Sequence, residues 1–238
     1  MKGIVLAGGK GTRLYPLTHA VSKQLLPVYR NPMVFYPIMT LRDMGIKDIM
    51  IITTQDQQQL FAEALQKVKQ VNLTFAIQKE PRGLPEALVI AKEWLNGEDV
   101  VLILGDNIII NNAPIEYKPN SIFTFEVLAP ERYGVVKITD GKIDCIIEKP
   151  HHFVSRDAVI GLYMFTNDAC DVAAELKPSA RGELEIVDLI REMDCKHQMH
   201  VQQLDGFWFD AGNHDDLLDC ANLVRTIEHR SSRKFYLS

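Results

Sequence analysis

An α/β fold with a mostly parallel central sheet, extended by a small mixed or antiparallel insertion, is predicted for this chain. The first observation is that short apolar runs alternate with helical patterns as far as Asp106. Runs that are apolar throughout are typical of strands buried on both faces, and strands separated by helices form parallel sheets. The second observation is that strand patterns with close turns follow after residue 120. This change favours an insertion of antiparallel or mixed strands.

The first half of the chain is predicted to alternate strands and helices. Apolar periodicity and the residues at the ends of each segment define the elements. Pro32 precedes the first helix and Gly45 follows it, which are favoured positions for these residues. The predicted strands span 2–7, 46–53, 72–77 and 100–104, and the predicted helices span 33–44, 57–68 and 84–95.

The second half is predicted to carry more strands and to end in a helix. Two prolines and an Asn-Asn pair make 111–120 a loop. The basic tail from His229 to Lys234 is expected to be solvated and frayed. A single domain, 1–238, is expected, with a nucleotide-binding half at 1–110 and a sugar-binding half with the C-terminal helix at 111–238. The predicted strands span 121–128, 134–138, 142–147, 158–165, 199–204 and 208–210, and the predicted helices span 184–193 and 215–229.

Composition excludes several classes of protein. The chain has 238 residues, 47% hydrophobic and 24% charged, with a net charge of −5, so no basic excess favours nucleic acid as a partner. No run of 18 apolar residues predicts a membrane span, and the N-terminal apolar run is too short for a signal peptide. Four cysteines without a C-x-x-C motif are expected to be free and buried, which favours the cytoplasm. His197-x-x-His200 has no third ligand nearby, so a metal site there is not favoured.

A glycine-rich loop follows the first predicted strand. Gly8, Gly9 and Gly11 let the backbone approach a ligand closely, and successive N–H groups can then face phosphate oxygens. Arg13 can add a bidentate contact. A Walker loop would need glycine where Ile4 stands, and the dinucleotide fingerprint would need glycine at position 14, which is leucine. A tight turn without a ligand remains the alternative.

Two aspartates follow predicted strands. Asp106 comes after the strand 100–104, and Asp210 ends the last predicted strand. Ligands bind at the carboxyl ends of parallel strands, and Mg²⁺ takes a few carboxylates together with phosphates and waters. The two aspartates could hold Mg²⁺, or each could cap the turn that follows it.

Several motifs resemble those of one enzyme family. Gly8-Gly9-Lys10-Gly11-Thr12-Arg13-Leu14, followed by Ser22-Lys23-Gln24-Leu25-Leu26-Pro27, is similar to the motif pair of the sugar-1-phosphate nucleotidylyltransferases. The resemblance runs from residue 2 to about residue 225. It is strongest to the glucose-1-phosphate thymidylyltransferase branch, in a short form without the extra C-terminal helices.

The resemblance implies a Rossmann-like nucleotidyltransferase fold and a reaction. A nucleotidyl group would pass, with Mg²⁺, from a nucleoside triphosphate to a sugar 1-phosphate, and pyrophosphate would leave. The favoured substrates are dTTP and glucose 1-phosphate or a related sugar. UTP or CTP with another sugar 1-phosphate is an alternative, and a non-catalytic nucleotide-sugar-binding protein is a weaker one. A homo-oligomer is expected, with no nucleic-acid or membrane partner.

The resemblance also implies the site residues. Gln78 matches the segment that reads the base, since its amide offers both a donor and an acceptor to a pyrimidine. The catalytic residues would be Arg13, Lys23, Asp106, Lys149 and Asp210, of which Asp106 and Asp210 would hold the metal. The nucleotide would be bound by Leu6, Gly8, Gly9, Gly11, Thr12, Arg13, Gln24, Gln78, Gly83 and Asp106. The sugar would be bound by Asn107, Gly134, Glu148, Lys149, Val159, Arg181 and Trp208.

Four departures from the family pattern fall in the sugar half. Ile147 stands where the family has glutamate, and strand alternation would put it on the same face as Lys149. Ile160 stands where the family has threonine, isoleucines at 108–110 replace Phe-Tyr, and the segment 111–120 is a loop. We therefore hypothesise that the sugar differs from glucose, or that fewer of its hydroxyls are recognised.

Overall fold

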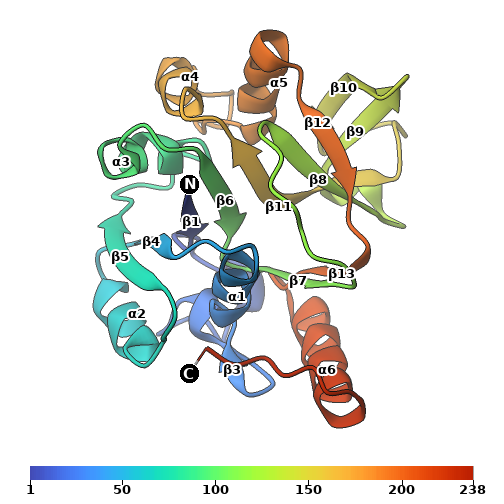
Figure 1. The fold of residues 1–238 in the computed structure, drawn as a ribbon. Helices are drawn as coiled ribbons and strands as arrows, with labels where there is room; N and C mark the ends of the chain where they lie inside the picture. The colour runs from blue at the N-terminus through green and yellow to red at the C-terminus, as the bar shows by residue number, and fades with distance from the viewer. Residues whose placement is uncertain (238) are drawn as a thin grey trace. The chain divides into compact units, whose positions relative to one another are not determined.

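The computed structural model describes residues 1–237, which divide into two compact units (Figure 1). The first, termed the β1 unit, comprises 2–81, 103–114 and 206–237. The second, termed the β11 unit, comprises Met1, 82–102 and 115–205. Because the units interleave along the chain, neither corresponds to one of the halves proposed above, and that division stays a prediction.

Three parallel strands form the frame of the β1 unit. They are β1 (Lys2–Leu6), β4 (Asp48–Thr53) and β5 (Asn72–Ile77), paired in the order β1-β4-β5. The centre of β1 and all of β4 after Asp48 are buried, as the apolar runs predicted. Helices α1 (Phe35–Asp43) and α2 (Gln58–Leu65) follow the predicted pattern but are shorter at both ends.

A small antiparallel pair in the β1 unit joins distant parts of the chain. Strand β7 (Asn107–Asn111) pairs with β13 (Gly206–Asp210), and Asp210 stands opposite Asn107. The sequence analysis did not predict β7. Its isoleucines are buried on both sides, so they lack the alternation by which a strand is recognised. The short pair of β2 (Pro27–Val28) and β3 (Asn31–Pro32) was also not predicted.

The C-terminal part of the β1 unit corrects one prediction. Helix α6 spans His214–Arg230, and Asn213 is its N-cap residue. The Asn213 side chain accepts a hydrogen bond from the Asp216 N–H. The basic residues at the end of α6 and in the tail are mostly exposed, as expected, but the tail is not frayed. Phe235 and Leu237 are buried, the Asn31 amide donates to the Phe235 carbonyl at 2.7 Å, and the Lys69 N–H donates to the Leu237 carbonyl at 2.8 Å. Apolar burial beyond residue 234 therefore fixes the basic stretch in place.

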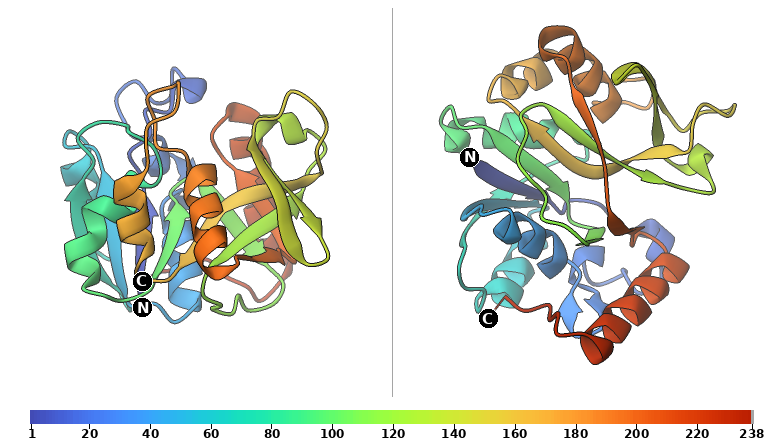
Figure 2. Two further views of the ribbon diagram at one scale, coloured as in Figure 1. Left: turned by 90° about the horizontal axis from the view of Figure 1, so that it is seen from above. Right: turned by 45° about the vertical axis from the view of Figure 1, so that its right-hand side comes forward.

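Antiparallel pairs dominate the β11 unit, as the close turns predicted. Strands β9 (Gly134–Thr139) and β10 (Lys142–Glu148) form a hairpin, seen in Figure 2. Strand β11 (Asp157–Phe165) pairs antiparallel with β8 (Ser121–Glu126), and β12 (His200–Gln203) runs parallel to β8.

The helices of the β11 unit are α3 (Glu86–Leu95), α4 (Ala169–Glu175) and α5 (Ile186–His197). The short helix α4 was not predicted. Strand β6 (Val100–Leu104) begins in this unit, and its last two residues belong to the β1 unit.

The four cysteines were expected to be free and buried. All four cysteines are free, and Cys170 and Cys220 are buried as expected, but Cys145 is only partly buried and Cys195 is exposed. Cys195 lies on the solvent side of α5, so the expectation of burial is wrong there.

Within residues 1–237, no helix combines the length and apolar character that crossing a membrane requires.

Candidate active site

The glycine loop packs against two predicted site residues. It leaves β1 after Leu6 and reaches Gly11, whose φ of 64° places it in the left-handed region. A Cβ on Gly8 would lie 2.7 Å from the Gln78 Oε1, and one on Gly9 would lie 3.6 Å from the Lys23 Nζ. The glycines therefore let both polar side chains lie directly on the loop.

The loop also forms one wall of a pocket of about 270 Å³ in the β1 unit. A stacked pair, Tyr15 and His19, with ring centroids 4.3 Å apart, also lines this pocket. Thr54, Asp56 and Gln57 contribute to the lining as well. Space beside the loop favours a bound ligand over a tight turn alone.

Lys23 and Asp106 form a buried ion pair with a hydrogen bond. Their side chains are 12% and 11% exposed. Burial acts to raise the pKa of Asp106, but the charge and hydrogen bond of Lys23, helped by the Asn107 amide, lower that pKa overall. Asp106 is therefore ionised at neutral pH, and it lies beside the glycine loop.

Asp210 lies next to Asp106. The β7–β13 register brings it opposite Asn107, and the Ala211 N–H donates to the Asp106 carbonyl at 3.0 Å. The Arg13 Nη2 is 3.9 Å from the Asp210 Oδ2. Burial and the negative charge of Asp106 raise the pKa of Asp210 to about 6. Two carboxylates, predicted from segments about 100 residues apart, thus gather at one place in the β1 unit.

The carboxylate pair fits a hard divalent cation. Mg²⁺ is bound by one or two protein carboxylates and completes its octahedron with waters and substrate phosphates. Within residues 1–237, no group of three or more His, Cys, Asp and Glu side chains could hold a metal ion. Because Mg²⁺ needs only one or two protein carboxylates when phosphates complete its coordination, a site of Asp106 and Asp210 suits a metal that arrives with a phosphorylated substrate. The His197 Nε2 lies 2.6 Å from the Asp168 Oδ2.

Asp210→Asn is expected to stabilise the metal-free protein at neutral pH. The unfolded carboxyl titrates near 4 and the folded one near 6. Between these values the folded state binds more protons, so the Asp210 contribution to stability falls as pH rises. In buffer with EDTA, the variant should be about 2 kcal/mol more stable than the parent at pH 7, and the difference should vanish near pH 4. Urea titrations at both pH values measure it, and a variant that is less stable at pH 7 would contradict the prediction.

The other predicted residues of the β1 unit vary in exposure. Thr12 and Arg13 are exposed, and Leu6 is half-buried. Gln24 is buried and accepts a hydrogen bond from the Ser22 hydroxyl at 2.5 Å.

Trp208 and Asn107, which were both predicted to bind the sugar, are hydrogen-bonded to each other. The Trp208 Nε1 donates to the Asn107 Oδ1 at 2.6 Å, and both side chains are buried. Trp208 therefore braces β13 against β7.

Five predicted sugar-binding residues lie in the β11 unit. The Lys149 Nζ is 3.6 Å from the Glu148 Oε1, and a Cβ on Gly134 would lie 3.0 Å from the Glu148 Oε2. Arg181 lies near enough to Glu148 for the negative charge to help raise the pKa of the guanidinium, behind the larger effect of Glu185. Val159 is half-buried on β11, opposite Thr124. The predicted phosphate-binding cations thus lie within one charged cluster.

The structure corrects how the departures from the family pattern were interpreted. Lys149 lies beyond the end of β10 with a φ of 44°, so strand alternation does not put it on the face of Ile147. Ile160 is fully buried, and the isoleucines at 108–110 are buried in β7. Only Ile147, 37% exposed, remains as a candidate contact to a sugar.

Gly83 has a structural reason to be glycine. It forms a parallel bridge with Leu184, has a φ of 105°, and would place a Cβ 2.1 Å from the Leu184 carbonyl oxygen. The sequence analysis expected its backbone to approach the base. The close approach seen within the β11 unit is to the Leu184 backbone.

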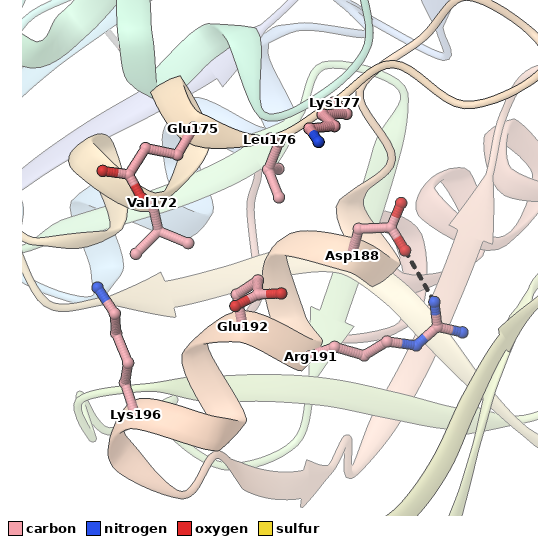
Figure 3. Close-up of a pocket in the computed structure, with 8 residues that line it drawn as sticks. All are labelled: Val172, Glu175, Leu176, Lys177, Asp188, Arg191, Glu192 and Lys196. Atoms are coloured by element: carbon pink, nitrogen blue, oxygen red, sulfur yellow. Dashed lines mark hydrogen bonds and ion pairs between the residues drawn. The ribbon is translucent and has the colours of Figure 1, made fainter.

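A second pocket, of about 570 Å³, lies between α4 and α5 (Figure 3). Arg191 donates to Asp188 at 2.7 Å and to the Ile146 carbonyl at 2.6 Å. None of the residues predicted for the site is among the eight that line this pocket.

Sequence comparison places the chain among known proteins. The model of the family described as nucleotidyl transferase matches residues 2–226. A glucose-1-phosphate thymidylyltransferase from Xanthomonas campestris pv. campestris (strain B100) is 44% identical over 242 residues, covering 96% of this chain and 82% of the relative. A protein of the same name from Mycolicibacterium smegmatis (strain ATCC 700084 / mc(2)155) is 43% identical over 246 residues, covering 98% and 85%.

Structural comparison agrees. A crystal structure from Bacillus anthracis, assigned as a glucose-1-phosphate thymidylyltransferase and containing a sucrose, has a TM-score of 0.87 at 36% identity, covering 94% of this chain and 95% of that one. A UDP-glucose pyrophosphorylase complexed with UDP-glucose has a TM-score of 0.83 at 24% identity, covering 94% and 98%. The second similarity concerns the fold alone.

Proposed function

Because this chain belongs to the nucleotidyl transferase family, we propose that it transfers a thymidylyl group from dTTP to glucose 1-phosphate or a closely related sugar 1-phosphate. The products are a dTDP-sugar and pyrophosphate. The observation that carries the proposal is the meeting of Lys23, Asp106 and Asp210 beside the glycine loop. Relatives of 43–44% identity that carry the thymidylyltransferase name support the choice of substrates.

The reaction is an in-line displacement at phosphorus. An oxygen of the sugar phosphate attacks the α-phosphorus of dTTP, and the bond from that phosphorus to the bridging oxygen of the β-phosphate breaks. The attacking phosphate is already ionised, so no general base is required. Such reactions depend on positioning and on stabilising charge more than on covalent catalysis.

The residues of the β1 unit act on the nucleotide. The Arg13 side chain is 61% exposed and only loosely paired with Asp210, so its guanidinium is open to the phosphates. The glycine-loop amides and Lys23 add positive potential where pyrophosphate leaves. Asp106 and Asp210 would hold Mg²⁺, which would supply positive charge to offset that of the phosphates.

The residues of the β11 unit act on the sugar phosphate. Lys149 and Arg181 supply the two cations that a phosphate dianion needs. Glu148 and Gly134 are assigned to the sugar itself. Because Ile160 and the isoleucines of β7 are buried, only Ile147 now supports a sugar other than glucose.

The proposal also covers the nucleotide base, the cellular compartment and the oligomeric state. Gln78 can pair with any pyrimidine, so UTP and CTP remain the competing nucleotides. Free cysteines and a nucleoside triphosphate substrate support a cytoplasmic reaction. A homo-oligomer remains part of the proposal.

Initial rates of pyrophosphate release test the substrates. We expect the fastest release with dTTP when glucose 1-phosphate is offered with dTTP, UTP, CTP, ATP and GTP in Mg²⁺. Faster release with UTP or CTP would replace the base assignment, and binding without release from any triphosphate would favour the non-catalytic alternative. With the best nucleotide, a clear preference for glucose 1-phosphate over deoxy and amino analogues would end the hypothesis of a different sugar.

A further inference from the structure

Glu185 holds a position that the sequence analysis did not assign. It precedes α5 in an extended conformation, with a φ of −88° and a ψ of 135°, and its side chain makes no capping hydrogen bond to its own helix. A glutamate at this place can reach forward to the free N–H groups of the first helical turn. Instead, its carboxylate turns back toward the preceding loop.

The Glu185 carboxylate accepts two hydrogen bonds from the Arg181 guanidinium. The Arg181 Nε donates to Oε1 at 3.1 Å, and the Arg181 Nη2 donates to Oε2 at 2.7 Å. The Ser179 hydroxyl donates to the same Oε1 at 2.7 Å. A bidentate pair fixes the plane of the guanidinium as well as its position. The Nη1 group and one N–H of Nη2 stay outside the pair and can bind a phosphate.

The loop that carries Arg181 is closed on itself and anchored. The Ser179 hydroxyl accepts from the Arg181 N–H at 3.2 Å, and the Ser179 N–H donates to the Glu183 carbonyl at 2.8 Å. The Leu184 N–H donates to the Arg82 carbonyl at 2.7 Å. Since hydrogen bonds hold the backbone on both sides of Arg181, Glu185 acts mainly on the Arg181 side chain.

The charges around Glu185 favour its ionised form. The side chain is 14% exposed, against 48% for Arg181. Burial acts to raise the pKa of Glu185, but hydrogen bonds from Arg181 and Ser179 and the charge of Lys149 lower it overall. Glu185 therefore stays an acceptor at neutral pH, in contact with one phosphate-binding cation and close to the other.

We propose that Glu185 is a positioning residue, which orients the Arg181 guanidinium toward the phosphate of the sugar 1-phosphate. The proposal rests on the function proposed above and adds a residue to it. Glu185 itself touches no substrate, because a carboxylate would repel a phosphate dianion. Its effect passes through the bidentate pair, so it depends on Arg181.

The test is the KM for glucose 1-phosphate in Glu185→Gln. A glutamine presents an NH2 group to one of the arginine donors and breaks one arm of the pair. We expect the KM for glucose 1-phosphate to rise about tenfold, with the KM for dTTP unchanged. Simple charge screening predicts the opposite sign, because loss of a negative charge would attract the phosphate. A lower or unchanged KM for glucose 1-phosphate would overturn the proposal.

A double-mutant cycle separates positioning from structural damage. In an Arg181→Ala background, Glu185→Gln should have no further effect on the KM for glucose 1-phosphate. With Arg181 present, Glu185→Asp keeps a carboxylate and should raise the KM less than Glu185→Gln does. An additive loss would show that Glu185 acts without Arg181 and would contradict the proposal. Asp188→Asn, which removes an exposed Asp–Arg pair from the same helix, is the matched control and should leave the KM unchanged. If the parent enzyme turned over no substrate, the proposed function would fail; if it did and the cycle were additive, only this inference would fail.

Discussion

Asp106→Asn is expected to reduce kcat for pyrophosphate release by about 100- to 1000-fold. The asparagine removes one of the two carboxylates proposed to hold the metal, and it leaves Lys23 without its hydrogen-bonded partner. The charge that develops on the phosphates is then poorly compensated, so the loss should appear in kcat more than in KM for dTTP. Steady-state rates at saturating Mg²⁺ measure it.

Loss of folding must be separated from loss of chemistry in that variant. Removal of one partner of a buried ion pair leaves the other charge uncompensated and costs about 3 kcal/mol. The double variant Lys23→Met/Asp106→Asn no longer leaves the lysine charge unpaired, so it should recover much of that stability and none of the activity. If the single variant kept more than a tenth of the parent kcat, Asp106 would not have the role assigned to it.

Gly83→Ala is expected to destabilise the protein by about 3 kcal/mol or more. The new methyl group would lie 2.1 Å from the Leu184 carbonyl oxygen and 2.8 Å from its nitrogen, at a φ of 105°. Both atoms belong to the backbone, so the bridge between the two residues must open. Urea unfolding of the parent and the variant measures the loss.

Two other glycines provide controls for the strain of a positive φ alone. Gly141 and Gly182 have φ values of 74° and 76°, and no atom lies within 4 Å of a Cβ built on either. Their alanine variants should lose only about 1 kcal/mol. If Gly83→Ala were as stable as these controls, the contact with Leu184 would not be the reason for a glycine there.

Strong local patterns in the sequence predicted much of the fold. The runs 72–77 and 100–104 match β5 and β6 in both bounds, because each is a short segment of strand-forming residues between two helical patterns. Helix α4 was missed because seven residues rich in alanine carry too little periodicity. The tail was misjudged for a different reason, since Phe235 and Leu237 are buried by distant parts of the β1 unit.

The residues of the candidate site also divide into those that the sequence could predict and those that it could not. The glycine loop and the two aspartates could be predicted because their residue types and their places at strand ends both indicate phosphate and metal chemistry. Glu185 could not, although it lies within a recognised motif, because its contact with Arg181 depends on how the loop closes. Lys149 shows the limit of strand alternation, since its φ of 44° ends the pattern one residue after Glu148.

One spectrum tests the central claim most directly. Enzyme, dTTP, glucose 1-phosphate and Mg²⁺ are incubated together and followed by ³¹P NMR. The proposed displacement predicts equal amounts of a sugar-linked pyrophosphate diester and free pyrophosphate, with loss of the glucose 1-phosphate signal. Free phosphate with dTDP, or a triphosphate that is hydrolysed while glucose 1-phosphate remains, would contradict nucleotidyl transfer to the sugar phosphate.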